Sequence, residues 1–205
     1  MHHQPNNRSS SSGAIYHGVL NMSKRTTLLD RIIEAELDMF QTVSTCGPNR
    51  CLEHPRAFRL HRAAQFAIFS DATLKSYLDD IETAKKGHIN LMTIKYARMD
   101  RLVPCYNSSP LVREVADIMI AWQLQLQEKY PDLMQRARPV TTQDDDPGKT
   151  SFETYLKSEL ETYSERTLSL LLQDLHGLEA QDKNGSEEIY RYLVRSVNQT
   201  TQQGD

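Results

Sequence analysis

Residues 29–40 read LDRIIEAELDMF, and this stretch decides the fold. Its apolar side chains recur every three or four positions, which is the spacing of one face of an α-helix. A helix is therefore expected over residues 24–43, and its apolar stripe consists of Leu29, Ile32, Ile33, Leu37, Phe40 and Val43. Glu36 falls in the middle of this stripe. Because a buried carboxylate is costly unless it is paired, Glu36 should have a partner.

The same helical spacing covers most of the chain, and the alternating pattern of β-strands is scarce. Helices are expected over residues 24–43, 55–69, 71–86, 90–102, 110–130, 152–176 and 187–198. Several have end signals: Ser70 can cap the third, and Ser109 precedes a proline at the first position of the fifth. The sequence thus predicts an all-α, single-domain bundle of six to seven helices.

The ends of the chain are polar and differ from its middle. Residues 1–23 contain a serine run and little apolar content, so a disordered tail is expected there. Residues 24–198 form the expected helical domain, and residues 199–205 are expected to fray. A length of 205 residues suits one domain of this kind.

Charge and composition exclude several classes of protein. The chain has 24 Lys+Arg against 27 Asp+Glu, so it is not a generally basic nucleic-acid or DNA binder, although a local basic face remains possible. It has no long apolar run and no secretory signal, which predicts a cytoplasmic protein without membrane contact. Three cysteines form no disulfide framework. Cys46, Cys51 and His54 lack a second pair of ligands, so no metal site is expected.

Polar side chains inside the apolar stripes are the main functional signal. They lie on four of the expected helices and comprise Glu36, His61, Gln65, Lys95, Arg98 and Glu159. Two interpretations remain open at this point. These residues pair internally as a structural ion network, or they line a polar pocket that receives a charged ligand or transfers protons.

A second signal is a basic strip at residues 49–62. It contains Arg50, Arg56, Arg59 and Arg62 against Glu53 alone. Arg56 and Arg59 point away from the stripe of their helix, and Arg62 lies at its flank. Such a strip is either an ordinary solvated face or a surface for an anion such as RNA phosphate.

The polar residues inside the apolar stripes lie in segments that resemble a known family. Residues 33–40 (IEAELDMF), 58–66 (FRLHRAAQF), 76–81 (SYLDDI) and 90–99 (NLMTIKYARM) resemble a small helical family whose fungal members are arginine-containing cyclodipeptide synthases. The similarity extends to residues 129–139 and 159–164 and covers most of the chain. It implies an enzyme that joins arginyl-tRNA and a second aminoacyl-tRNA into a cyclo-Arg-Xaa diketopiperazine, as an early step of secondary-metabolite biosynthesis. No ATP, metal or other cofactor is implied, because the amino acids arrive as activated esters.

The resemblance also implies roles for individual residues. Its acidic motif matches Asp79, Asp80 and Glu82, although Glu82 lies one position closer to the aspartates than the motif has it. Together with Glu36 and His61 these are the expected catalytic residues. The expected substrate-binding residues are Gln65, Lys95, Tyr96, Arg98 and Glu159, and the expected tRNA-binding residues are Arg50, Arg56, Arg59 and Arg62. The alternative is a non-catalytic helical interaction module in which the buried ions are structural.

Overall fold

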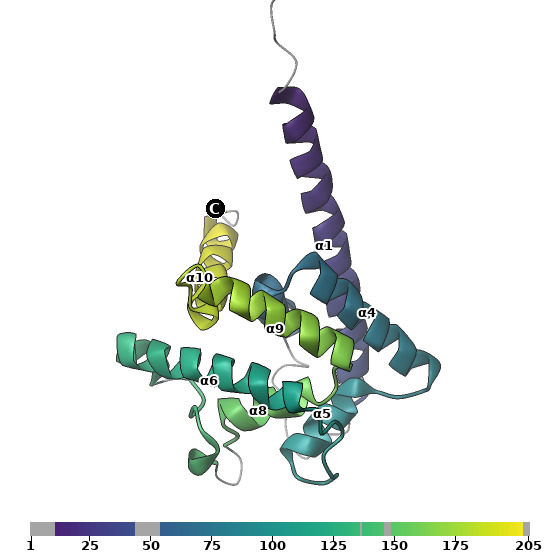
Figure 1. Ribbon diagram of the computed structural model, residues 1–205, viewed down its shortest axis with the longest axis vertical. Coiled ribbons are helices and arrows are strands. Elements are labelled where there is room, and N and C mark those ends of the chain that lie inside the picture. The colour runs from purple at the N-terminus through teal and green to yellow at the C-terminus, as the bar shows by residue number, and fades with distance from the viewer. Residues whose placement is uncertain (1–10, 44–53, 136, 146–148, 203–205) are drawn as a thin grey trace, which may run out of the picture.

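The computed structural model describes residues 11–43, 54–135, 137–145 and 149–202. Within these ranges the chain forms nine α-helices and two short 3-10 helices and contains no β-strand, which confirms the all-α prediction (Figure 1). None of the helices in this part of the chain combines the length and apolar character needed to cross a bilayer.

The described helices follow one another along the chain. They are α1 (Ser11–Gln41), α3 (Pro55–Gln65), η1 (Phe66–Ile68), α4 (Asp71–Lys86), α5 (Leu91–Met99), α6 (Pro110–Lys129), α7 (Pro131–Met134), η2 (Thr142–Asp144), α8 (Phe152–Leu160), α9 (Glu165–Glu179) and α10 (Gly185–Gln202). The helix expected over residues 152–176 is divided into α8 and α9. The division falls at Ser164, whose side chain accepts a hydrogen bond from the Thr167 amide and so caps a new helix.

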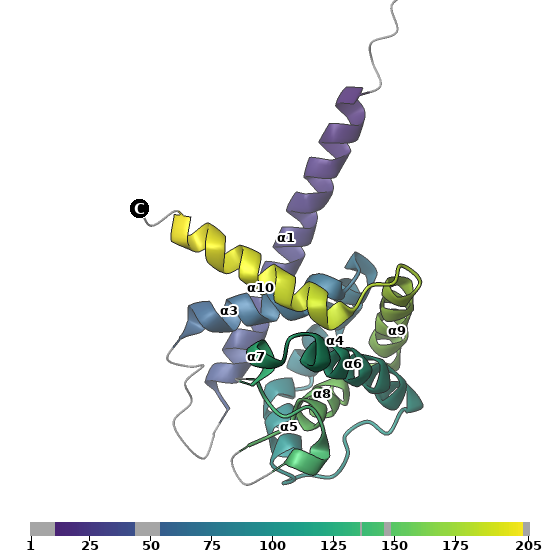
Figure 2. The same ribbon diagram turned by 90° about the vertical axis from the view of Figure 1, so that its left-hand side faces the viewer.

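Helix α1 begins at Ser11, well before the expected start at residue 24. Its first part projects away from the rest of the molecule (Figures 1 and 2). An existing helix propagates into polar sequence more readily than a new helix nucleates there, so this extension needs no apolar partner. The last part of α1 packs on α3, α4 and α5 and buries Ile32, Leu37 and Phe40.

Two helix-turn-helix units in the core have related sequences. The first consists of α3, η1 and α4, and the second of α8 and α9. The residues that the two units share at equivalent positions are Phe58 and Phe152, Ser70 and Ser164, Thr73 and Thr167, Leu74 and Leu168, Leu78 and Leu172, and Asp80 and Asp174. Leu74 and Leu168 are both fully buried, so the shared pattern marks one packing arrangement used twice.

The two units hold each other's helix ends. Asp174 on α9 accepts hydrogen bonds from the Ser70 amide (2.8 Å) and the Thr73 hydroxyl (2.5 Å) at the start of α4. Asp80 on α4 accepts the corresponding bonds from the Ser164 amide (3.0 Å) and the Thr167 hydroxyl (2.7 Å) at the start of α9. A carboxylate near the N-terminus of a helix also interacts favourably with the helix dipole. This reciprocal capping locks α4 against α9, which lie side by side in Figure 1.

Removal of one capping carboxylate should therefore destabilise the domain. We expect Asp80→Ala to lower the free energy of unfolding by about 1–3 kcal/mol, because two buried donors lose a charged acceptor. The neighbouring Asp79 is exposed, so Asp79→Ala is the matched control and should change little. Urea denaturation followed by circular dichroism measures both. Equal effects of the two substitutions would contradict the capping role of Asp80.

Candidate functional site

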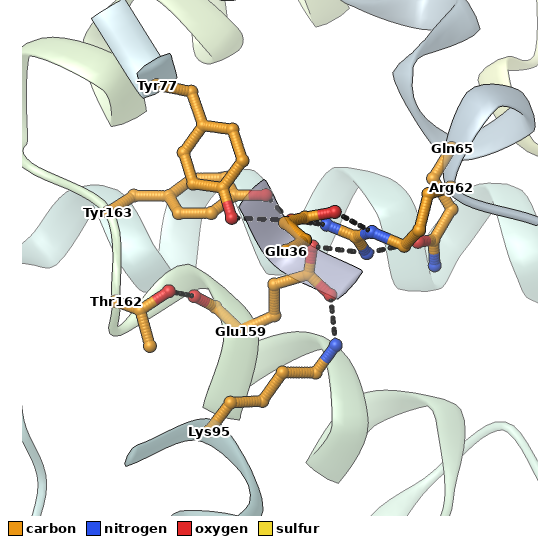
Figure 3. Close-up of polar contacts among 8 residues, drawn as sticks. All are labelled: Glu36, Arg62, Gln65, Tyr77, Lys95, Glu159, Thr162 and Tyr163. Carbon is orange, nitrogen blue, oxygen red and sulfur yellow. Dashed lines mark hydrogen bonds and ion pairs between the residues drawn. The ribbon is translucent and has the colours of Figure 1, made fainter. Parts of the chain in front are cut away.

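Five helices bring ionisable side chains to one point in the core (Figure 3). Glu36 of α1 is completely buried. Its Oε2 accepts a hydrogen bond from Arg62 Nε (2.6 Å), and its Oε1 accepts bonds from Arg62 Nη2 and from the Tyr77 hydroxyl (2.6 Å). The guanidinium thus holds the carboxylate in a two-pronged geometry, which is the strongest form of this ion pair.

Arg62 joins this carboxylate to a second one. Its Nη1 donates to Glu159 Oε1 (2.9 Å) and to the Gln65 side-chain oxygen. Gln65 lies three residues after Arg62 on α3, so both side chains leave the same face of the helix. The guanidinium carbon also lies 4.7 Å from the centre of the Phe66 ring, a favourable distance for a cation over an aromatic face.

Glu159 is the second hub of the cluster. Its Oε2 accepts a hydrogen bond from Lys95 Nζ (2.6 Å) and its Oε1 one from the Tyr163 hydroxyl (2.9 Å). Tyr163 lies four residues after Glu159, next to the end of α8, and this spacing places the two side chains together. Lys95 Nζ also lies 3.8 Å from the centre of the half-buried Tyr155 ring.

The charges of the cluster hold one another in their ionised forms. Burial alone would raise the pKa of Glu159, but Arg62 and Lys95 keep it far below its ordinary value of 4.5. Burial would likewise lower the pKa of Lys95 and Arg62, but the carboxylates raise both. For Tyr77 and Tyr163, burial and the neighbouring carboxylates both raise the pKa, so these hydroxyls remain hydrogen-bond donors.

The arrangement is therefore a chain in the order Glu36, Arg62, Glu159, Lys95. Two carboxylates balance two cations, and Ser109 Oγ is the only buried side-chain polar atom of the described residues that lacks a partner. Glu159 binds a proton too weakly to act as a general base near neutral pH. The chemistry that this chain offers is electrostatic: it fixes the Lys95 ammonium and the tyrosine hydroxyls in place.

The structure confirms most of the predicted interior polar residues and corrects two on α3. Glu36, Gln65, Lys95 and Glu159 meet in the cluster. His61 was expected inside, but it is exposed, whereas Arg62 was expected on a tRNA-binding surface and is buried. The reason is the rotation of α3: Arg62 lies four residues after the buried Phe58 and follows it on the inner face, which turns His61 outward.

Of the two other predicted substrate-binding residues, Arg98 lies outside the cluster and Tyr96 lies beside it, with its ring centre 5.9 Å from Lys95 Nζ. Arg98 is partly buried and forms a separate two-pronged pair with Glu161, through Nε to Oε2 (2.6 Å) and Nη2 to Oε1 (3.0 Å). Its Nη1 donates to the Val103 carbonyl (2.7 Å), so it fixes the loop after α5. Tyr96 is half-buried and packs with its ring centre 5.5 Å from that of Phe40.

The acidic motif is not assembled into one site. Asp79 is exposed, and Asp80 caps α9 as described above. Glu82 pairs with Arg31 at the surface, at 2.8 Å between Nη2 and Oε1. Asp80 lies one position from Asp79 and two from Glu82, so its side chain points away from both of the others.

Ion pairing neutralises part of the positive charge of the basic strip. Arg59 is exposed but forms a two-pronged pair with Glu34, through Nε to Oε1 (2.6 Å) and Nη2 to Oε2 (2.8 Å). Arg56 is exposed, and Arg50 lies outside the described residues. Cys46 and Cys51 also lie outside them. In the described ranges, no three His, Cys, Asp or Glu side chains are grouped so that they could hold a metal ion.

The sequence pattern missed three members of the cluster: Tyr77, Tyr163 and Arg62. Both tyrosines fit the apolar stripes of their helices, so the pattern assigned them to the core without a polar role. For Tyr163 the sequence did contain a signal, because this residue follows Glu159 by one helical turn. The pattern placed Arg62 at the flank of its stripe. On the short α3, a shift of one position is enough to turn a side chain from the flank to the inner face.

Fold and site together define an all-α domain with a charge-balanced ion chain buried at its centre. Residues 26–201 match the family described as "Protein of unknown function (DUF4125)". Because the match covers most of the chain, the protein belongs to this family. No curated protein and no solved structure matches the chain.

The buried chain should be far more important for stability than an exposed pair of the same kind. We expect Glu36→Leu to destabilise the fold by about 3–5 kcal/mol, because it leaves the Arg62 guanidinium without its main partner in the core. Glu34, on the same helix and in the same type of pair with Arg59, is exposed. Glu34→Leu is therefore the control and should have a small effect in the same urea titration. A small effect of Glu36→Leu would contradict the structural importance of the chain.

Glu159 should also contribute to acid sensitivity. Its pKa is lower in the folded state than its ordinary value of 4.5, so its ionised form stabilises the fold above pH 4.5. This contribution is lost as the pH falls below 4.5, because the unfolded state then takes up the proton first. We expect the unfolding midpoint of the wild-type protein to fall more steeply below pH 4.5 than that of Glu159→Gln. Parallel pH profiles of the two proteins would contradict this assignment.

Proposed function

We propose that the protein is an aminoacyltransferase that uses arginyl-tRNA and a second aminoacyl-tRNA to make a cyclo-Arg-Xaa diketopiperazine. In each of its two steps an α-amine attacks the carbonyl carbon of an aminoacyl ester. One C–N bond forms, one ester C–O bond breaks, and the proton lost by the amine goes to the leaving ribose oxygen of the tRNA. The second step closes the six-membered ring.

The proposal rests on one observation: the segments that resemble the cyclodipeptide synthase family meet at the buried cluster. Residues 33–40, 58–66, 76–81, 90–99 and 159–164 are distant in sequence, and each supplies a side chain to the buried cluster: Glu36, Arg62 with Gln65, Tyr77, Lys95, and Glu159 with Tyr163. A buried ion chain of this size stabilises a domain no better than apolar packing would. Concentrated ionisable groups with strongly shifted pKa values are typical of functional sites.

The geometry suggests a division of roles within the cluster. Glu36, Arg62 and Glu159 are buried and bonded to one another, so we assign them to positioning. Lys95 is the terminal cation of the chain, and its Nζ lies against the Tyr155 ring. The exposed Arg138 has its guanidinium carbon 5.3 Å from the same ring centre. These two cations beside one tyrosine ring are our candidate for stabilising the negative charge of the tetrahedral intermediate.

The main competing function is a non-catalytic interaction module, and one observation favours it. The ion chain is electrically balanced and its hydrogen bonds are satisfied within the protein, as a purely structural network would be. The two functions differ in what Lys95 does. In an enzyme it contributes to the reaction, and in a module it contributes to folding alone.

The proposal is tested by incubating the protein with tRNA, arginyl-tRNA synthetase, a mixture of the other synthetases, ATP and amino acids, and by searching for cyclo-Arg-Xaa masses. We expect a product from the wild-type protein and at least a tenfold lower rate from Lys95→Met. Lys95→Arg, which keeps the positive charge, should retain more activity than Lys95→Met. Lys157→Met removes a partly exposed lysine from α8 and is the matched control.

Two readouts separate catalysis from folding. The helical circular dichroism of Lys95→Met should equal that of the wild-type protein while its rate falls. Activity of the wild-type protein should also decrease with added salt, because phosphate contacts of tRNA release counterions. No cyclo-Arg-Xaa product with any second amino acid would refute the proposal, and equal rates for the wild-type protein and Lys95→Met would remove Lys95 from the mechanism.

A further inference from the structure

A groove of about 580 Å³ lies between α1 and α4, away from the buried ion chain. Its apolar floor contains Ala35, Met39, Leu78, Ile81 and Ile89. A volume of this size is within the range of small-molecule sites, which are mostly apolar with a few polar groups. The groove is therefore large enough for an amino acid or a short peptide.

Polar contacts define the shape of this groove. The side-chain amide of Asn90 donates to the Met39 carbonyl (2.8 Å) and to the Thr42 hydroxyl (2.8 Å), which ties the start of α5 to the end of α1. The Arg31–Glu82 ion pair, at 2.8 Å, joins α1 to α4. These links fix α1, α4 and the loop 88–90, which carry the lining residues, so the groove does not depend on a ligand for its form.

The charges around the groove are only partly neutralised. The lining contains Arg31, Glu34, Asp38, Glu82, Lys85 and His88. Arg31 and Glu82 pair with each other, and Glu34 pairs with Arg59. Asp38 and Lys85 are both exposed and have no ion pair in the part of the chain that the structure describes. One carboxylate and one ammonium at the same groove thus remain available.

We propose that this groove binds a zwitterionic α-amino acid with an apolar side chain. The ammonium of the ligand pairs with Asp38, its carboxylate pairs with Lys85, and its side chain covers the apolar floor near Met39 and Ile89. This complementarity requires both charges on the ligand at once. It is independent of the proposed aminoacyl transfer, because an aminoacyl ester has no free carboxylate and the binding needs no tRNA.

The test is a titration of the full chain with leucine, followed by two-dimensional NMR. Leucine should shift the amide resonances of Ala35, Thr42, Ile89 and Asn90 in a saturable way. Leucinamide lacks the carboxylate and 4-methylpentanoate lacks the ammonium, so each should bind more weakly than leucine. Leucyl-leucine carries its two charges farther apart than leucine does, so it should bind more weakly than leucine.

Charge-specific variants then assign the two contacts. Asp38→Asn should weaken leucine binding about fivefold, as expected for an exposed ion pair, and leave 4-methylpentanoate binding unchanged. Lys85→Gln should weaken leucine binding similarly and leave leucinamide binding unchanged. Asp30→Asn on α1 and Lys86→Gln on α4 are matched controls, because both residues are exposed and do not line the groove.

Three results would overturn the proposal. The first is the absence of saturable shifts at the groove with leucine, or tighter binding of leucyl-leucine than of leucine. The second is equal binding of leucine and 4-methylpentanoate, which would show that the ammonium is not recognised. The third is an effect of Asp30→Asn as large as that of Asp38→Asn. None of these results bears on the formation of cyclo-Arg-Xaa, so the two proposals fail separately.

Discussion

The guanidinium of Arg62 lies between Glu36 and Glu159, and the arrangement of the core depends on this placement. One side chain of α3 thereby connects α1 to α8, and through Glu159 it also connects to Lys95 on α5. Charges removed from water must be paired almost completely, or the desolvation penalty exceeds the attraction between them. The relative positions of these four helices are consequently restricted to those in which both carboxylates reach Arg62.

A second constraint comes from the related helix-turn-helix units. Asp80 and Asp174 each cap the helix of the other unit, so α4 and α9 are held by the same contact made twice. The units differ where the ion chain passes through them. Gln65 and Glu159 occupy equivalent positions and both accept a hydrogen bond from Arg62, but only one of them is charged. The repeated scaffold therefore carries an asymmetric polar centre.

The polar centre and the groove offer different kinds of chemistry. The buried chain satisfies its own hydrogen bonds, and its Lys95 contacts the half-buried Tyr155 ring. The groove between α1 and α4 leaves Asp38 and Lys85 without ion pairs among the described residues. The buried chain and the groove thus lie on separate faces of α1, which contributes Glu36 to one and Asp38 to the other.

The sequence by itself determined the helices and most of the interior polar residues. Helical spacing predicted Glu36, Gln65, Lys95 and Glu159 inside the fold because a side chain's direction follows from its place along a helix. The same spacing failed at His61 and Arg62, where a rotation of one residue on the short α3 exchanges inside and outside. Only the tertiary structure decided which charges meet, why Asp80 caps α9 and how Tyr77 reaches Glu36, since these contacts join segments far apart in sequence.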